Sequence, residues 1–109
     1  MPNRNTMEAN KEKEYTCRVC GYLHSRPFYE EGAATSDICP CCGSESGYHD
    51  FTPDGVEMNR RRWIRKGAKW HADEWVEKGD KVDKTELKPE NWSLEEQLRR
   101  IGVDLKDYQ

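Results

Sequence analysis

The sequence predicts a small α+β domain: a three-stranded β-sheet, an amphipathic helix packed on it, and a short helix near the C-terminus. Three observations predict this fold. The chain is short and polar, with 109 residues of which 34% are hydrophobic and 36% charged. Its cysteines form two closely spaced pairs, and a helical pattern of bulky residues begins only after them. So little apolar surface rarely supports a fold alone, so we expect a cross-link or a bound ion to add stability.

Four of the five cysteines form two C-x2-C units, Cys17 with Cys20 and Cys39 with Cys42, separated by 18 residues. The odd number of cysteines and a start without an apolar stretch argue against a disulfide framework. Two residues between paired thiolates let one tight turn direct both sulfurs at one ion, and two facing turns complete a tetrahedral set. We therefore predict Cys17, Cys20, Cys39 and Cys42 as the ligands of one metal ion.

A glycine directly follows each pair, at Gly21 and Gly43, where the turn needs a positive φ that glycine adopts at little cost. This placement selects Cys42 rather than Cys41 as the fourth ligand, because Gly43 then follows the second ligand of its pair. Cys41 is left as a spare thiol. It is either a packed bystander or an alternate, oxidation-sensitive ligand.

The turns read YTCRVCGY (15–22) and ICPCCG (38–43), and they resemble the knuckles of rubredoxins and zinc ribbons. We call residues 17–21 the first knuckle and residues 39–43 the second knuckle. The resemblance covers about residues 14–52 and implies a rubredoxin-like, three-stranded zinc-ribbon sheet. The metal would be structural zinc or, as in rubredoxins, iron that carries electrons. We favour zinc because the spacer is shorter than the one rubredoxins usually carry.

The continuation ICPCCGSESGYHDF is also similar to small bacterial cysteine-rich proteins with a CPxC signature, for some of which an immunity or interaction role is suspected. This second resemblance implies a bacterial protein without catalytic activity.

Composition and turn signals divide the chain into five segments. The third strand is expected at 48–51 and is ended by 52–55. Ser93 is the expected N-cap of the last helix, with Glu96 as its capping-box partner. The segments are a disordered leader (1–13), the ribbon domain (14–55), an amphipathic helix packed on the ribbon (56–77), a charged linker (78–91), and a short C-terminal helix with a tail (92–109).

The stretch 56–71 holds six Lys or Arg residues and one Glu, although the whole chain has a formal net charge of −3. Helical phase places the aromatic residues on one side of this stretch and most basic residues on the other. We predict that the basic side, together with apolar residues of the last helix, forms an interaction face. Its candidate residues are Arg61, Arg62, Arg65, Lys69, Trp92 and Leu98.

Four thiolates fill the coordination shell of the predicted metal, so no position remains for a substrate or a reactive water. His24, His49 and His71 belong to no metal or catalytic motif and are expected as surface or packing residues. No apolar run approaches the roughly eighteen residues of a membrane span. We predict a non-enzymatic cytoplasmic protein that uses zinc to fold a protein-interaction module, with a possible immunity or adaptor role. The alternatives are a rubredoxin-like iron electron carrier and a nucleic-acid-binding zinc ribbon that stacks bases on Trp63 and Trp70.

Overall fold

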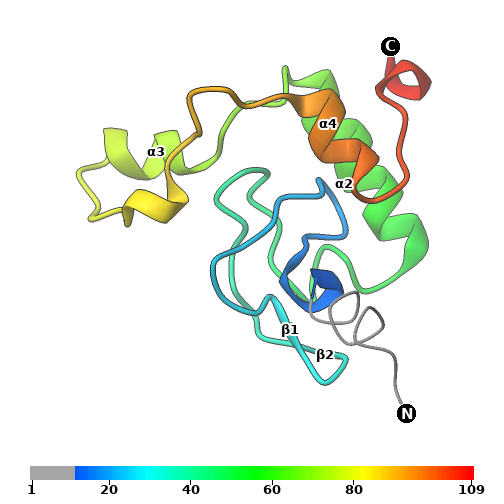
Figure 1. Cartoon of the computed structure of the whole chain (residues 1–109), viewed down its shortest axis with the longest axis horizontal. Coiled ribbons are helices and arrows are strands. Elements are labelled where there is room, and N and C mark those ends of the chain that lie inside the picture. Colours follow the sequence, from blue (N-terminus) through cyan, green and yellow to red (C-terminus); the bar gives the residue numbers. More distant parts are fainter. Residues whose placement is uncertain (1–11) are drawn as a thin grey trace.

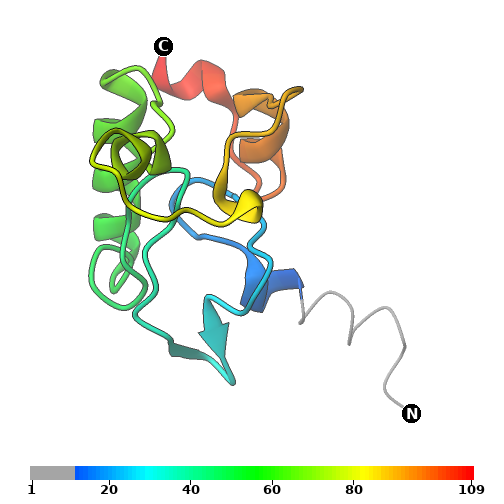
Figure 2. The same cartoon turned by 90° about the vertical axis from the view of Figure 1, so that its left-hand side faces the viewer.

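The computed structural model describes residues 12–109, so most of the predicted leader, residues 1–11, lies outside the described residues. The two knuckle loops occupy the middle of the molecule, and the helices surround them (Figure 1). Helices α2 and α4 stand on opposite sides in Figure 2, where the 3-10 helix η2 lies between them and contacts both. The elements are β1 (Tyr29–Glu30), β2 (Ala33–Ala34), α2 (Pro53–Arg65), α3 (Ala72–Glu77), η1 (Lys84–Glu86), α4 (Leu94–Arg99) and η2 (Leu105–Tyr108).

The β-structure is smaller than predicted. Strands β1 and β2 form a two-residue antiparallel hairpin in which Tyr29 pairs with Ala34. Each knuckle is flanked by a single β-bridge, one between Thr16 and Leu23 and one between Ile38 and Glu45. The expected third strand at 48–51 is wrong: this segment consists of turns and a bend. Within residues 12–109 each knuckle is therefore flanked by an isolated β-bridge, and the two knuckles are not part of a three-stranded sheet.

The helix predicted over 56–77 is two helices. Helix α2 begins earlier, at Pro53, because the side chain of Thr52 accepts a hydrogen bond from the Gly55 N–H at 3.0 Å and proline is favoured in a first turn. It ends before Gly67, whose φ of +98° reverses the chain. The indole N–H of Trp63 donates to the Lys69 carbonyl at 2.9 Å and holds this reversal. Helix α3 then starts at a new angle.

The charged segment 78–91 is tied to Tyr22, the residue that follows the first knuckle, and to the turn after α2. The Tyr22 hydroxyl donates to the Thr85 carbonyl at 2.6 Å, and the Trp70 indole donates to the Glu86 carbonyl at 2.8 Å. Both acceptors belong to η1, so the predicted linker contains an anchored turn.

Helix α4 begins as predicted, since the Ser93 hydroxyl accepts a hydrogen bond from the Glu96 N–H at 3.3 Å. Its Leu98 side chain is 0% exposed, so the helix is docked on its own chain. None of the described helices has the length and apolar character needed to span a membrane.

Cysteine sulfur and aromatic rings make up much of the buried core. Outside the knuckles, the Trp92 ring packs edge-on against Trp63 and Trp70. The buried apolar cluster consists of Cys17, Val19, Cys20, Phe28, Tyr29, Cys39, Cys41, Trp63, Ala68, Trp70 and Ala72. Because the core contains so few aliphatic residues, its stability depends on the state of the cysteine sulfurs, whether they are protonated or bound to a metal ion.

Replacing Leu98 with alanine tests the docking of α4. Because the side chain is fully buried, we expect the free energy of unfolding to fall by about 3 kcal/mol. The control is Leu87→Ala, whose side chain is 42% exposed and should cost well under half as much. Equal losses in a chemical denaturation experiment would contradict the docked position of α4.

Candidate metal centre

The sulfur atoms of Cys17, Cys20, Cys39 and Cys42 all lie within 4.8 Å of one another. Cys17 Sγ is 3.8 Å from Cys42 Sγ, and Cys20 Sγ is 3.7 Å from Cys39 Sγ. A disulfide would require about 2.05 Å. A regular tetrahedron with metal–sulfur bonds of about 2.3 Å has sulfur–sulfur edges of about 3.8 Å. These two spacings therefore match two edges of a tetrahedral thiolate site.

The four thiols cannot all ionise without a compensating positive charge. Burial raises the pKa of Cys17, Cys20 and Cys39. Burial also opposes ionisation of Cys42, but hydrogen bonds from the other three cysteines and from Ser44 lower its pKa well below the usual range. Burial thus works against ionisation at all four cysteines. A bound cation would let all four ionise, which fits the donor set.

The two knuckles repeat each other with an offset of 22 residues. The Gly21 N–H donates to the Cys17 carbonyl at 2.9 Å, and the Gly43 N–H donates to the Cys39 carbonyl at 2.8 Å. Both glycines have a positive φ, +83° and +81°, as predicted from their position. The local sequence therefore shapes each knuckle in the same way, so that both aim their sulfurs inward.

Each knuckle exposes two backbone carbonyls between its cysteines, and the rest of the chain satisfies them differently. In the first knuckle the donor is the guanidinium of Arg60 on α2. Its Nε donates to the Val19 carbonyl at 2.8 Å and its Nη2 to the Arg18 carbonyl at 2.9 Å. Arg60 is buried, and its Nη1 donates to the Tyr108 hydroxyl at 3.0 Å, which ties η2 to the same group.

In the second knuckle the donors are backbone N–H groups at the start of α3. The His71 N–H donates to the Cys41 carbonyl at 2.9 Å, and the Ala72 N–H donates to the Pro40 carbonyl at 2.8 Å. These carbonyls are the equivalents of those that Arg60 binds. A helix start has N–H groups without intrahelical partners, so this contact serves both the knuckle and α3.

Gln97 on α4 joins the two knuckles. Its Nε2 lies 2.9 Å from the Cys20 carbonyl and 3.3 Å from Cys41 Sγ, and its Oε1 accepts from the Trp92 indole at 2.7 Å. Cys41 is fully buried and is not a member of the four-sulfur cluster. This position agrees with the packed-bystander interpretation of Cys41. Any side chain at position 21 would collide with the backbone carbonyl oxygen of Gln97. Gly21 is therefore required for this close approach of α4 as well as for its positive φ.

The predicted interaction face is not one surface. Leu98 belongs to the interior, and Trp92 is half-buried against other indole rings. Arg61 is held by an ion pair with Glu57 at 2.7 Å and lies over the Tyr108 ring. Hence two predicted residues are packing groups and Arg61 is already engaged. The predicted members that remain exposed are Arg62, Arg65 and Lys69.

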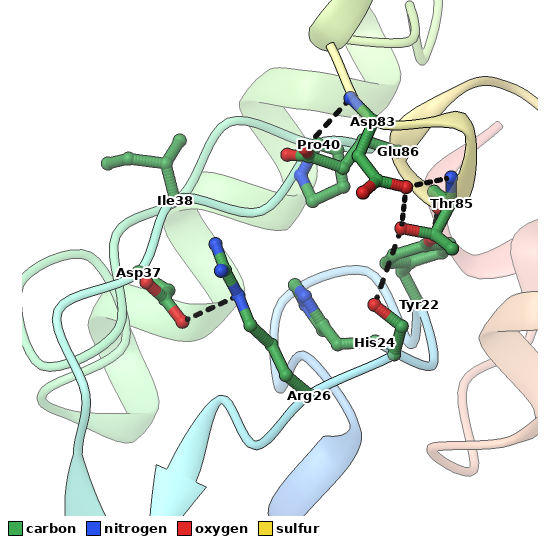
Figure 3. A pocket seen from close by; sticks show the side chains of 10 residues that line it. Tyr22, His24, Arg26, Asp37, Ile38, Pro40, Asp83, Thr85 and Glu86 are labelled. Carbon is green, nitrogen blue, oxygen red and sulfur yellow. Dashed lines mark hydrogen bonds and ion pairs between the residues drawn. The ribbon is translucent and has the colours of Figure 1, made fainter.

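His24 is a packing residue, as predicted, and it lines a small polar cavity of about 80 Å³ (Figure 3). Its ring stacks on Phe28 at 4.2 Å between centroids. Its Nε2 is buried and has no hydrogen-bond partner among the described residues. Burial lowers the pKa of His24 to about 4, although Cys42 and Asp37 act in the opposite direction. The imidazole is therefore neutral at pH 7.

The sequence pattern was not used to predict a role for Arg60 or Gln97. Both positions nevertheless share a feature that could have indicated one, a polar residue within the apolar face of a helix. Arg60 lies at a helical spacing from Val56 and Ile64 that places it in the middle of an apolar face. Gln97 lies in the same way within the stripe of Leu94, Leu98 and Ile101. A polar side chain at such a position needs a buried partner.

Replacing Arg60 with methionine tests its role at the first knuckle. The substitution keeps the side-chain bulk but leaves two carbonyls without donors, so we expect a loss of about 3 kcal/mol in the free energy of unfolding. Zinc loaded into the site should also be released to a chelator faster than from the wild type. The matched control is Arg65→Met, because Arg65 is exposed on the same helix. A chelator rate equal to that of the control would contradict this role.

Replacing His24 with phenylalanine tests its buried neutral state. Below pH 6.5 His24 binds a proton in the unfolded chain but not in the folded chain, where its pKa is about 4. The free energy of unfolding therefore decreases as the pH is lowered. We expect His24 to cost the wild type on the order of 2 kcal/mol between pH 7 and pH 5. The His24→Phe variant should lack this contribution. Parallel pH profiles for the two proteins in thermal unfolding would refute it.

Comparison with known proteins identifies two relatives. The chain is 32% identical over 119 aligned residues to the uncharacterized protein YoaQ of Bacillus subtilis (strain 168), and the match covers 90% of this chain and 95% of YoaQ. It is 40% identical over 75 residues to the uncharacterized protein YozI of the same strain, covering 52% of this chain and 62% of YozI. No family model matches the chain, and no solved structure matches it. The similarity to YoaQ runs through almost the full length of both proteins, and this chain therefore belongs to the YoaQ family.

Proposed function

We propose that the protein is a non-enzymatic zinc-binding scaffold, in which a structural four-cysteine site folds a module for interaction with other proteins. The observation that carries this proposal is the four-sulfur cluster, with its tetrahedral spacing and three fully buried sulfurs. When zinc is bound, it supplies cohesion to the core and not chemistry, because four thiolates leave no open coordination position.

The attachment of the other elements to the knuckles supports a structural role for the site. Helix α2 binds the first knuckle through Arg60, α3 binds the second through backbone N–H groups, and α4 contacts the first through Gln97. Loss of the metal would loosen both knuckles and with them the anchoring of α2, α3 and α4. Structural zinc contributes on the order of 10 kcal/mol to small domains of this kind, which is enough to decide whether they fold.

An iron electron carrier is the second candidate, and one observation favours it. Cys42 is half-buried while the other three sulfurs have no exposed surface, so the site lies close to the surface on one side. Such a position would allow electron exchange with a partner. Zinc remains our choice because the spacer between the knuckles is shorter than that of the rubredoxins it resembles.

A nucleic-acid-binding function has less support. The stacking that it requires would use Trp63 and Trp70, which are only 8% and 3% exposed. Arg61, one of the basic residues it invokes, is engaged with Glu57.

Substituting neighbouring cysteines tests the metal assignment. We expect Cys39→Ser to abolish stoichiometric zinc binding, measured by elemental analysis, and to unfold the chain because the site becomes incomplete. The matched control is Cys41→Ser, which changes an equally buried thiol outside the cluster and should retain zinc. Stoichiometric iron with visible thiolate absorption would assign the electron carrier instead. Zinc retention by Cys39→Ser would overturn the ligand set.

A further inference from the structure

Cys42, a half-buried residue, lines a surface groove of about 650 Å³ between the end of α2 and α3. This volume is within the range of ligand sites in proteins. Because the other three cysteines of the cluster are fully buried, the four-sulfur cluster comes closest to the surface at Cys42. Its walls carry many charged side chains, so their arrangement restricts what the groove can hold.

One wall is cationic. Arg62 and Lys66 stand four residues apart at the end of α2, on the same side of the helix, and Lys69 follows in the turn. Within residues 12–109 none of these three side chains forms an ion pair or a side-chain hydrogen bond, in contrast to Arg60 and Arg61, which both reach Glu57. This wall therefore presents three exposed cations that are not committed to the fold.

The opposite wall is anionic. It is formed by Asp73, Glu74 and Glu77 of α3, which are all exposed. A Glu74 carboxylate oxygen lies 3.7 Å from the Nδ1 of His71, and no Lys or Arg side chain of the described residues pairs with Glu74. No ion pair in the described part of the chain joins this wall to the cationic one. Side chains of both charge signs thus line the same groove, and no ion pair within 4.0 Å joins the two groups.

The charges that line the groove determine which kinds of charged partner it can bind. A polyanion such as a nucleic acid would be attracted to α2 and repelled by α3, and a polycation the reverse. A segment that carries both signs can satisfy both walls at once.

We infer that the groove binds an extended segment of a partner protein, with acidic side chains toward Arg62, Lys66 and Lys69 and basic side chains toward Asp73, Glu74 and Glu77. This inference rests on the proposed function as an interaction module and specifies the chemistry of its partner.

Three fluorescent synthetic peptides of equal length test it by fluorescence anisotropy at low ionic strength. One carries a glutamate block and a lysine block, one only the glutamates, and one only the lysines. We expect the zinc-loaded full-length protein to bind the mixed peptide about fivefold more tightly than either of the others, in line with a few exposed ion pairs. Equal binding of all three peptides would overturn the inference.

Charge reversal on each wall sharpens the test. The double variant Arg62→Glu with Lys66→Glu should prefer the lysine peptide, and the double variant Glu74→Lys with Glu77→Lys should prefer the glutamate peptide. The control is Lys106→Glu, an exposed change outside the groove that should keep the wild-type order. An unchanged order in both double variants would show that the peptides bind elsewhere.

Metal content and thermal unfolding of the same samples separate the two proposals. A folded, zinc-loaded protein that does not discriminate among the peptides would refute the groove and leave the zinc scaffold intact. A folded protein without metal that does discriminate would refute the zinc scaffold and support the groove.

Discussion

Four sulfur atoms lie within 4.8 Å of one another in the interior of a chain with few aliphatic core residues. Removing thiolates from water is unfavourable, and bringing them together adds mutual repulsion. The arrangement is stable only if the sulfurs stay protonated or if a cation neutralises them. The spacings of 3.7 and 3.8 Å within two of the pairs are those of a tetrahedral thiolate site, which fits the second case. The positions of α2, α3 and α4 follow from this constraint, because each of them hydrogen-bonds to a loop that carries the sulfurs.

The two knuckles have nearly the same backbone but different supports. A tight turn between two cysteines leaves its middle carbonyls pointing outward, and these must find donors when they are covered by the chain. The guanidinium of Arg60 fills this need at the first knuckle, and the first N–H groups of α3 fill it at the second. A guanidinium side chain and the N–H groups of a helix start thus provide the same thing, two hydrogen-bond donors for the two middle carbonyls of a knuckle. This also explains the break after α2, since one continuous helix would leave no free N–H groups for the second knuckle.

The same break creates the surface that we connect with function. The reversal at Gly67 turns the chain so that α3 faces the end of α2 across a groove beside Cys42. The exposed basic residues at the end of α2 and the acidic residues of α3 then line the same groove. Neither group is needed to hold the fold, because the ion pairs of Glu57 with Arg60 and Arg61 lie elsewhere on α2. A surface whose charges are not used internally is available for a partner.

The local pattern of residues was sufficient for the four-sulfur cluster, the glycine turns after each pair and the N-cap of the last helix at Ser93. Each of these depends on contacts within a few residues, or on the shared geometry of two identical motifs. The pattern did not predict the break at Gly67, the loss of the third strand or the burial of Leu98. These depend on which carbonyls and apolar faces meet in space, and Arg60 and Gln97 acquire their roles only through partners 41 and 77 residues away. The short-range geometry of the cysteine turns was thus written in the sequence, whereas long-range hydrogen bonding to their carbonyls decided how the helices are placed.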